Sequence, residues 1–465
     1  MTIITSFCGL CILLLAGKFL RVKIPLLQKL YLPSSVIAGL LGLTIIQVTT
    51  RVCANMDVPY VLANWTVGWS RLPGTLINIV FAALFLGVTI PPIRTIWRKA
   101  GPQLAYGQIV AWGQYAVGLG LALVLVAASF KIRTLMGVIV PVGFEGGHGT
   151  ASGLEEVFRL PKINWAEGFD FALASATIGI ISAIIAGMAL INLGARRGWL
   201  AKGSDPSALT KDELIGIYPI DKRPEAGRQT VASSSVDSLA LHLAFLGLAI
   251  LIGYGIKQLL ALVEGLSPAL AKQEILSNFP LFPLCMIGGM LLQLGFTRFA
   301  KTSPVDRELM QRLAGTALDF LVVAAISLIR IEVIKYALVP FATIVLGGII
   351  WNVFCVSWLA RRLLPDAWFE RAIAEMGQSM GVTATGLLLL RVVDSKNETP
   401  AAEAFAYKQL LHEPFMGGGL WTTSAVFLVA TWGAKPVLLI SVGAIGLWLT
   451  VWWLFLKPKK KTKET

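Results

Sequence analysis

Charged residues are scarce in this chain. They make up 14% of its 465 residues, about half the share of an average soluble domain, whereas hydrophobic residues make up 56%. Long apolar runs, built around SFCGLCILLLAG near the start and VLLISVGAIGLWLTVWWLFL near the end, reach the roughly 20 residues that a helix needs to cross a bilayer core. The composition excludes an ordinary soluble domain. It predicts an all-α polytopic membrane protein surrounded by a lipid bilayer.

Histidine and cysteine are also few, with three and five residues respectively. They show neither the spacing of metal ligands nor that of a disulfide framework, so we predict no transition-metal site and no cofactor. The pattern GxxxxGK[ST] does not occur, so ATP is not implied. The formal net charge of +14 comes from basic residues at the ends of apolar runs, which is typical of membrane anchoring and does not indicate a nucleic-acid partner.

Eleven apolar segments are predicted to span the membrane. They lie at residues 3–20, 33–50, 74–92, 103–128, 167–193, 237–262, 279–297, 314–329, 333–358, 412–432 and 436–456. Two further segments, 136–158 and 372–392, are rich in glycine and small polar residues and fit no ordinary span. Because non-helical backbone persists at membrane depth only where protein or a water-filled cavity satisfies it, we predict that both are re-entrant hairpins.

The basic residues predict the orientation of the chain. With the amino terminus outside, the main basic clusters and the long polar loop at 194–236 fall on the cytoplasmic side, as the positive-inside rule requires. Eleven crossings also place the basic tail KPKKKTKET in the cytoplasm. The exceptions are Lys131, Arg133, Arg330 and Lys335.

Two short sequence matches relate the two sides of the long loop. TASGL, which begins at Thr150, matches TATGL, which begins at Thr383. LPSSVIAGLLG resembles FPLCMIGGMLL and pairs Gly39 with Gly289. The two matches occur in the same order and at similar offsets near half the chain, which favours an internal repeat.

The matches predict a particular organisation of the chain. Two inverted-topology repeats of about five transmembrane helices, each with a re-entrant hairpin, occupy residues 1–193 and 237–432. The cytoplasmic loop 194–236 joins them, and residues 433–465 add one C-terminal helix and the basic tail. Inverted repeats are typical of secondary transporters, which bind their substrate near the membrane midplane at the repeat interface.

The segments EGGHGTAS (Glu145 to Ser152) and GQSMGVTAT (Gly377 to Thr385) carry chemistry suited to hairpins inside the membrane. Helix ends there offer N–H groups to an anion and carbonyls to Na⁺, and hydroxyl groups add neutral oxygens. Glycine-mediated helix packing is the alternative. Glu145 could bind a cation, carry a proton, pair with a substrate amine, or face water at the hairpin mouth. His148 could bond substrate or cap the hairpin tip.

These residues resemble the bacterial sodium:glutamate symporter family, which carries SGGHGT in a re-entrant loop of its first half and GATPTA in that of its second. The counterparts here are EGGHGT, from Glu145, and GVTATG, from Gly381. The resemblance extends to YLPSSVIAGLLG near the start, to ASATIGI after the first hairpin and to PFMGGG at Pro414, and it reaches about residue 432.

The resemblance implies Na⁺-coupled uptake of an anionic amino acid by a homodimer in the bacterial inner membrane, with an elevator-type movement between a scaffold and a transport unit. By position, Gly146, Gly147, His148, Gly149 and Thr150 would line one hairpin. Gly381, Thr383 and Thr385 would line the other.

Three departures from the family pattern concern the hairpins. Glu145 replaces a serine, Ala384 replaces a proline, and EMGQSMG, from Glu375, stands where the family has His-Cys-Gly-Phe-Gly. Glu145 adds a negative charge where an anionic substrate would bind.

We predict a secondary transporter, without a catalytic site, that carries a small organic anion such as glutamate or a related carboxylate together with Na⁺ by alternating access. The expected substrate-binding residues are Glu145, Gly146, Gly147, His148, Gly149, Gly381 and Thr383. The expected Na⁺ ligands are Thr150, Ser152, Thr383 and Thr385. The alternatives are a carrier of the same fold coupled to H⁺ or moving another solute, a channel and an intramembrane enzyme, for which only the His148–Glu145 pair is suggestive.

Overall fold

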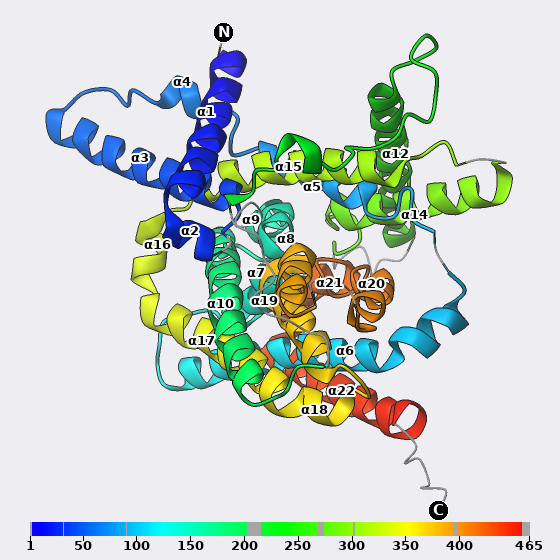
Figure 1. Ribbon diagram of the computed structural model, residues 1–465. Coiled ribbons are helices and arrows are strands. Elements are labelled where there is room, and N and C mark those ends of the chain that lie inside the picture. The colour runs from blue at the N-terminus through cyan, green and yellow to red at the C-terminus, as the bar shows by residue number, and fades with distance from the viewer. Residues whose placement is uncertain are drawn as a thin grey trace, which may run out of the picture. The chain divides into compact units, whose positions relative to one another are not determined.

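The computed structural model describes residues 2–30, 32–89, 91–201, 215–266, 274–300, 303–394 and 398–457. Within these ranges the chain forms helices and contains no strand, which confirms the all-α fold (Figure 1). Part of the predicted loop, at 202–214, and the predicted basic tail from residue 458 lie outside the described residues.

The helices form two compact units. Unit 1 comprises residues 1–89, 148–174 and 211–331, and unit 2 comprises residues 90–147, 175–210 and 332–465. The helices of unit 1 are α1 (Thr2–Lys23), α2 (Pro25–Lys29), α3 (Ser34–Met56), α4 (Ala63–Thr66), α5 (Leu72–Ala83), α8 (Gly147–Gly153), α9 (Glu155–Arg159), η2 (Ile220–Lys222), α12 (Ser238–Gly265), α14 (Leu281–Phe299) and α15 (Arg307–Ser327). Helix α10 (Gly168–Arg196) begins in unit 1 and continues in unit 2.

The helices of unit 2, besides most of α10, come from both sides of the long loop. They are α6 (Ile93–Ala127), η1 (Thr134–Val138), α7 (Ile139–Phe144), α16 (Ile331–Tyr336), α17 (Leu338–Phe354), η3 (Cys355–Leu359), α18 (Ala360–Leu363), α19 (Trp368–Val393), α20 (Ala401–His412), α21 (Leu420–Trp432), α22 (Ala434–Val451) and η4 (Trp452–Leu456). The compact units therefore do not coincide with the predicted repeats, because each unit draws on both halves of the chain.

Unit 1 contains two apolar clusters that are built alike. Helices α1, α3 and α15 enclose one, which includes Leu10, Ala38 and Val323. Helices α12, α14 and α5 enclose the other, which includes Leu246 and Cys285. Helix α1 packs against α3 as α12 packs against α14, and α3 packs against α15 as α14 packs against α5 (Figure 1). The opposite orientation of the predicted repeats stays a prediction.

Two glycines paired by the sequence allow equivalent close contacts in unit 1. A Cβ on Gly39 of α3 would lie 2.7 Å from the Cβ of Ile326 of α15. A Cβ on Gly289 of α14 would lie 2.2 Å from the carbonyl oxygen of Ala82 of α5. Both glycines thus bring helix axes together where a larger side chain would separate them, as small residues do in membrane helix packing.

Unit 2 is organised around α6, which at 35 residues is the longest helix described and extends about 52 Å. Helices α17, α20 and α22 pack along it (Figure 1). Helix α22, drawn in red, is the predicted C-terminal helix, and with η4 it reaches Leu456.

Ten helices among the described residues are long and apolar enough to cross a membrane. Nine of them coincide with predicted spans, and the tenth, α19, falls on the predicted re-entrant segment 372–392. The predicted spans 74–92 and 412–432 are wrong in length, because the helices there, α5 and α21, have only 12 and 13 residues.

Helix α5 ends early because other groups satisfy its last carbonyls. The guanidinium of Arg307 donates to the backbone oxygens of Ala83, Leu84 and Leu86 at 2.8–3.2 Å. Gly87, at φ +74°, continues the chain in a left-handed conformation. These contacts replace the hydrogen bonds that a further turn of helix would supply.

Helix α21 starts late because the stretch PFMGGG forms a loop after α20. The backbone N–H groups of Leu420 and Trp421 donate to the carbonyls of Pro414 and Phe415 at 2.8 and 2.9 Å. A Cβ on Gly419 would lie 2.0 Å from the oxygen of Pro414, so only glycine fits there. The hydropathy pattern does not separate this loop from α21, so it predicted a single span at 412–432.

Candidate functional site

Helix α19 reverses direction inside the predicted second hairpin. Gly381 and Val382 have non-helical backbone angles, and Val382 has φ +66° and ψ 170°. The Cα of Gly386 lies 2.6 Å from the position that a Cβ on Gly377 would take. Nine residues of continuous helix would separate the two glycines by about 13.5 Å, so the two arms of α19 fold back against each other.

A second break follows α7, at Glu145 and Gly146, within the predicted first hairpin. Gly147 has φ +68°, and a Cβ there would lie 2.4 Å from Cγ1 of Val382. The break after α7 and the reversal of α19 therefore meet inside unit 2. A backbone conformation such as that of Val382 is strained for a β-branched residue, and such strain clusters at functional sites.

A buried ion pair lies beside this meeting point. The ammonium of Lys408 on α20 donates to Oε1 of Glu375 at 2.7 Å, to Oε1 of Gln409 at 2.9 Å and to Oε1 of Gln378 at 3.2 Å. The other carboxylate oxygen of Glu375 accepts from Nε2 of Gln103 on α6 at 2.9 Å. The Lys408 and Glu375 side chains are both 0% exposed, and all three N–H groups of the ammonium are used.

Glu145 belongs to the same buried region. Its Oε1 lies 2.5 Å from Nε2 of His412 on α20, and both side chains are 0% exposed. Nδ1 of His412 lies 3.2 Å from Nε2 of Gln108 on α6. Of the alternatives that the sequence left open for Glu145, exposure to water at a hairpin mouth does not agree with this position, because the side chain is 0% exposed and contacts His412 and Gln378.

Two glutamines connect these pairs into one network. Gln378 accepts from Lys408 and donates from Nε2 to Oε1 of Glu145 at 3.3 Å. Gln409 accepts from Lys408 and donates to the hydroxyl of Thr383 at 2.6 Å and to Oε1 of Glu413 at 3.0 Å. The network thus runs continuously from His412 through α19 to the arm that follows the reversal.

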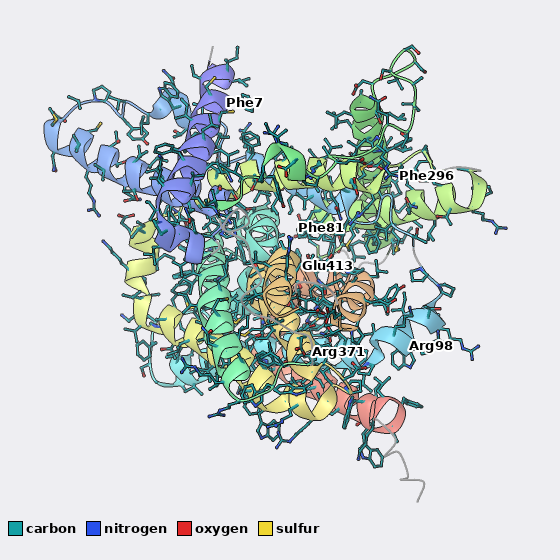
Figure 2. All side chains as sticks on the ribbon, in the orientation of Figure 1. Phe7, Phe81, Arg98, Phe296, Arg371 and Glu413 are labelled. Atoms are coloured by element: carbon teal, nitrogen blue, oxygen red, sulfur yellow. The ribbon has the colours of Figure 1, made fainter. Side chains whose placement is uncertain are left out.

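The predicted residues of the second hairpin take part in this network or border it. The hydroxyl of Thr383 donates to Glu413, which follows the last residue of α20 and is labelled in Figure 2. The hydroxyl of Thr385 donates to the carbonyl oxygen of Gly381. One carbonyl before the reversal, that of Ser379, accepts from Nε2 of Gln114 at 2.5 Å.

The other predicted residues of the first hairpin lie on α8, in unit 1. His148 and Thr150 are 3% and 0% exposed, and Ser152 is buried as well. A Cβ on Gly149 would lie 2.5 Å from Cδ1 of Ile77. Among the described residues, the hydroxyl oxygens of Thr150 and Ser152 have no hydrogen-bond partner. Helix α8 therefore carries two buried neutral oxygens that are two positions apart in the sequence.

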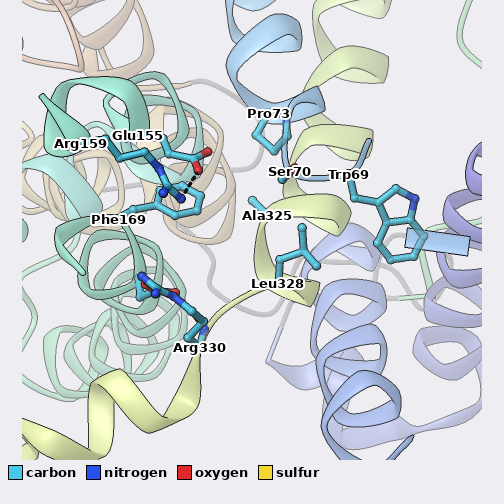
Figure 3. Close-up of a pocket in the computed structure, with 10 residues that line it drawn as sticks. Trp69, Ser70, Pro73, Glu155, Arg159, Phe169, Ala325, Leu328 and Arg330 are labelled. Carbon is cyan, nitrogen blue, oxygen red and sulfur yellow. Dashed lines mark hydrogen bonds and ion pairs between the residues drawn. The ribbon is translucent and has the colours of Figure 1, made fainter. Parts of the chain in front are cut away.

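Unit 1 also contains a small cavity of about 130 Å³ near α9 and the start of α10, lined by apolar and charged side chains (Figure 3). Arg159 pairs with Glu155 at 2.9 Å on its wall. The backbone N–H and guanidinium of Arg330 donate to the buried carboxylate of Asp170 at 2.7–3.0 Å. The hydrogen bonds of the guanidinium to Asp170 raise the pKa of Arg330. The cavity is too small for an amino acid, which needs a pocket of several hundred cubic ångströms.

The sequence did not reveal the α20 side of the network. Lys408 and His412 stand four residues apart on α20, and Glu413 follows. The sequence assigns no role to Lys408, and it places His412 and Glu413 at the start of the predicted span 412–432. A lysine and a histidine at that spacing beside an apolar face, including Ala404 and Phe405, are a usable signal of an inward-facing pair. Nothing in the sequence indicated that Glu375 and Glu145 were their partners.

No cluster of three or more His, Cys, Asp or Glu side chains is placed to hold a metal ion in the part of the chain that the structure describes. A family model described as sodium/glutamate symporter matches residues 1–396. No curated protein matches the chain. The family match ends before α20, short of the predicted limit near residue 432, so Lys408, His412 and Glu413 come from a segment beyond it.

Proposed function

Because the chain belongs to the sodium/glutamate symporter family, a family of transporters and not of enzymes, we propose that it carries glutamate or a closely related anionic amino acid together with Na⁺ by alternating access. The family, and the ten long apolar helices found among the described residues, make it a multi-pass membrane protein with Na⁺-coupled glutamate transport as its general activity. The choice of glutamate or a related anionic amino acid as substrate, and the alternating-access mechanism, are what we propose.

The observation that carries the proposal is the reversal of α19 beside a buried polar network. A helix interrupted within the membrane presents backbone groups and side chains to a solute instead of satisfying them internally. The reversal at Gly381 and Val382 brings Thr383 next to Gln409 and Glu413. This arrangement supports a solute site at the reversal, with Thr383 and the adjoining glycines in contact with substrate.

Two buried hydroxyls support the sodium part of the proposal. Thr150 and Ser152 have no hydrogen-bond partner among the described residues, although a buried polar group without a partner costs about 1–3 kcal/mol. Sodium prefers such neutral oxygens together with backbone carbonyls of interrupted helices. We assign Na⁺ coordination to these two residues, with Thr383 and Thr385 as the corresponding pair after the reversal of α19.

The composition of the two units supports an elevator-type mechanism. Each unit is compact by itself and each takes helices from both halves of the chain. Unit 2 contains the buried network, so we assign it, together with helix α8 that carries Thr150 and Ser152, to the transport unit and the remainder of unit 1 to the scaffold. A homodimer in the bacterial inner membrane, with the amino terminus outside and the carboxy terminus in the cytoplasm, completes the proposal.

The proposal is tested with the purified full-length protein in proteoliposomes. An inward Na⁺ gradient should drive accumulation of radiolabelled L-glutamate or L-aspartate, and replacing Na⁺ with K⁺ should abolish it. Thr383→Val removes the hydroxyl that joins Gln409 and Glu413 and should lower uptake at least about tenfold, equivalent to about 1.4 kcal/mol.

Thr450→Val is the matched control. The Thr450 hydroxyl is exposed on α22 and donates to the carbonyl of Gly446 on the same helix, so uptake should stay at the wild-type rate. Equal accumulation in K⁺ and Na⁺ would refute sodium coupling, and the absence of accumulation for every acidic amino acid would refute the substrate class.

A further inference from the structure

The Glu145–His412 pair is arranged so that the imidazole donates to the carboxylate. The indole N–H of Trp112 donates to Oε1 of Gln108 at 3.1 Å, which directs the amide N–H₂ of Gln108 toward His412. Because an indole can only donate, this contact fixes the orientation of the amide. Nδ1 of His412 is therefore an acceptor, and Nε2 carries the hydrogen that points to Glu145.

The buried charges around this pair do not balance. Glu145 and Glu375 are two carboxylates, and Lys408 supplies the one ammonium that the network contains among the described residues. The other buried cation of α19, the guanidinium of Arg371, pairs with Asp366 at 2.6 Å. All three N–H groups of Lys408 are used by Glu375, Gln378 and Gln409. With a neutral His412, one negative charge remains, and an unbalanced buried charge costs several kcal/mol.

The groups that face Glu145 within unit 2 do not remove this charge. Helix α19 contributes Glu375 and the amide of Gln378, and α20 contributes Lys408 and His412. Glu413, at the end of α20, adds a further carboxylate on the far side of Gln409. Helix α6 contributes the phenol of Tyr115, which interacts electrostatically with Glu145 and is not a cation.

The second oxygen of Glu145 is the atom that can accept a proton. Oε1 is shared by His412 and Gln378, whereas Oε2 is buried and has no hydrogen-bond partner among the described residues. A proton on Oε2 leaves both contacts of Oε1 intact and balances the two remaining charges, those of Glu375 and Lys408. A proton on Nδ1 of His412 would instead confront the amide N–H₂ of Gln108.

We propose that Glu145 and His412 form a proton-binding site in the transport unit, with one proton held on Oε2 of Glu145 and His412 setting its affinity. The consequence of this site for transport rests on the proposed function. A proton on Glu145 removes the negative charge that would repel an anionic substrate. Proton binding thereby links substrate uptake to pH in addition to Na⁺.

The site is tested by infrared difference spectroscopy of the purified full-length protein between pH 5 and pH 8, without substrate and without a transport assay. The wild type should lose a protonated-carboxyl C=O band as the pH rises, and Glu145→Gln should lack this band. Glu403→Gln changes an exposed carboxylate on the same helix as His412 and should keep it. His412→Phe should move the titration midpoint upward by about one pH unit, a tenfold change in proton affinity, because the carboxylate loses its N–H donor.

Each variant is first checked for wild-type elution in size-exclusion chromatography, and His412→Phe provides a second route if Glu145→Gln does not fold. A pH-difference spectrum unchanged by Glu145→Gln, or a midpoint unchanged by His412→Phe, overturns the inference. Loss of the band when Na⁺ is added at constant pH also overturns it, because Oε2 would then bind sodium. A band that titrates in a protein without Na⁺-driven uptake would retain the proton site and reject the proposed function.

Discussion

Unit 1 and unit 2 are both bundles of apolar helices, but their interiors differ in chemistry. Unit 1 joins its helices through two apolar clusters and through glycines such as Gly39 and Gly289. Unit 2 buries Glu145, Glu375 and Lys408 in a continuous hydrogen-bond network. Unit 1 buries the carboxylate of Asp170 too, but the side chain of its partner Arg330 is 52% exposed. Because buried charges are costly and helix packing does not require them, the network of unit 2 is the feature that distinguishes the two interiors.

The largest effect is expected when one charged group of the buried network in unit 2 is removed. Lys408→Met leaves Glu375 buried without its ammonium and should lower the free energy of unfolding by about 3–5 kcal/mol. The measurement is SDS-induced unfolding of the purified protein followed by tryptophan fluorescence.

Lys99→Met provides the control for Lys408→Met. Lys99 on α6 pairs in an exposed contact with Glu403 on α20, the helix that carries Lys408, so its removal should leave the unfolding curve almost unchanged. If Lys408→Met and Lys99→Met unfolded alike, the buried network would not be the feature that distinguishes unit 2.

The packing of unit 1 is tested by adding a single methyl group. Gly289→Ala places a Cβ against the backbone oxygen of Ala82, so α14 and α5 must separate, and the free energy of unfolding should fall by about 1–3 kcal/mol. The same unfolding assay measures it. Gly295→Ala, on the same helix but with open space at the Cβ position, should not destabilise the protein. Equal losses in both variants would contradict the close helix approach.

The smallest expected effect concerns the Arg330–Asp170 pair beside the cavity of unit 1. Arg330→Gln removes two hydrogen bonds from buried Asp170 but keeps the bond from the backbone N–H of residue 330. Because the arginine side chain is 52% exposed, the cost should be about 1 kcal/mol. Arg330→Lys should recover part of it. A loss as large as that of Lys408→Met would mean that unit 1 also depends on buried charge.

Much of the fold could be predicted from the sequence because apolar runs directly reflect the bilayer. Nine of the predicted spans coincide with long helices, and the interruption of α19 was predicted from its glycines and small polar residues. The errors arose where a helix end is satisfied by distant groups. Arg307 terminates α5 from more than two hundred residues away, and hydropathy contains no information about such a contact.

The candidate site could be predicted only where its residues form a motif. Glu145 and Thr383 were recognised within glycine-rich stretches, and both lie in the buried network. Lys408 and His412 lie in a helix that looks like a polar connector, and their partners are distant in the chain. Pairing between distant residues depends on tertiary structure, which one sequence without related sequences does not reveal.

The separation between Glu145 and His412 also has a consequence for biosynthesis. Their contact joins residues 267 positions apart. At a synthesis rate of about 5–20 residues per second, roughly 13 to 53 seconds pass between the translation of the carboxylate and that of the imidazole. During that interval the insertion machinery must accommodate an acidic residue whose eventual partner does not yet exist. Glu145 should therefore enter its final position late, after the helix that carries His412 has been made.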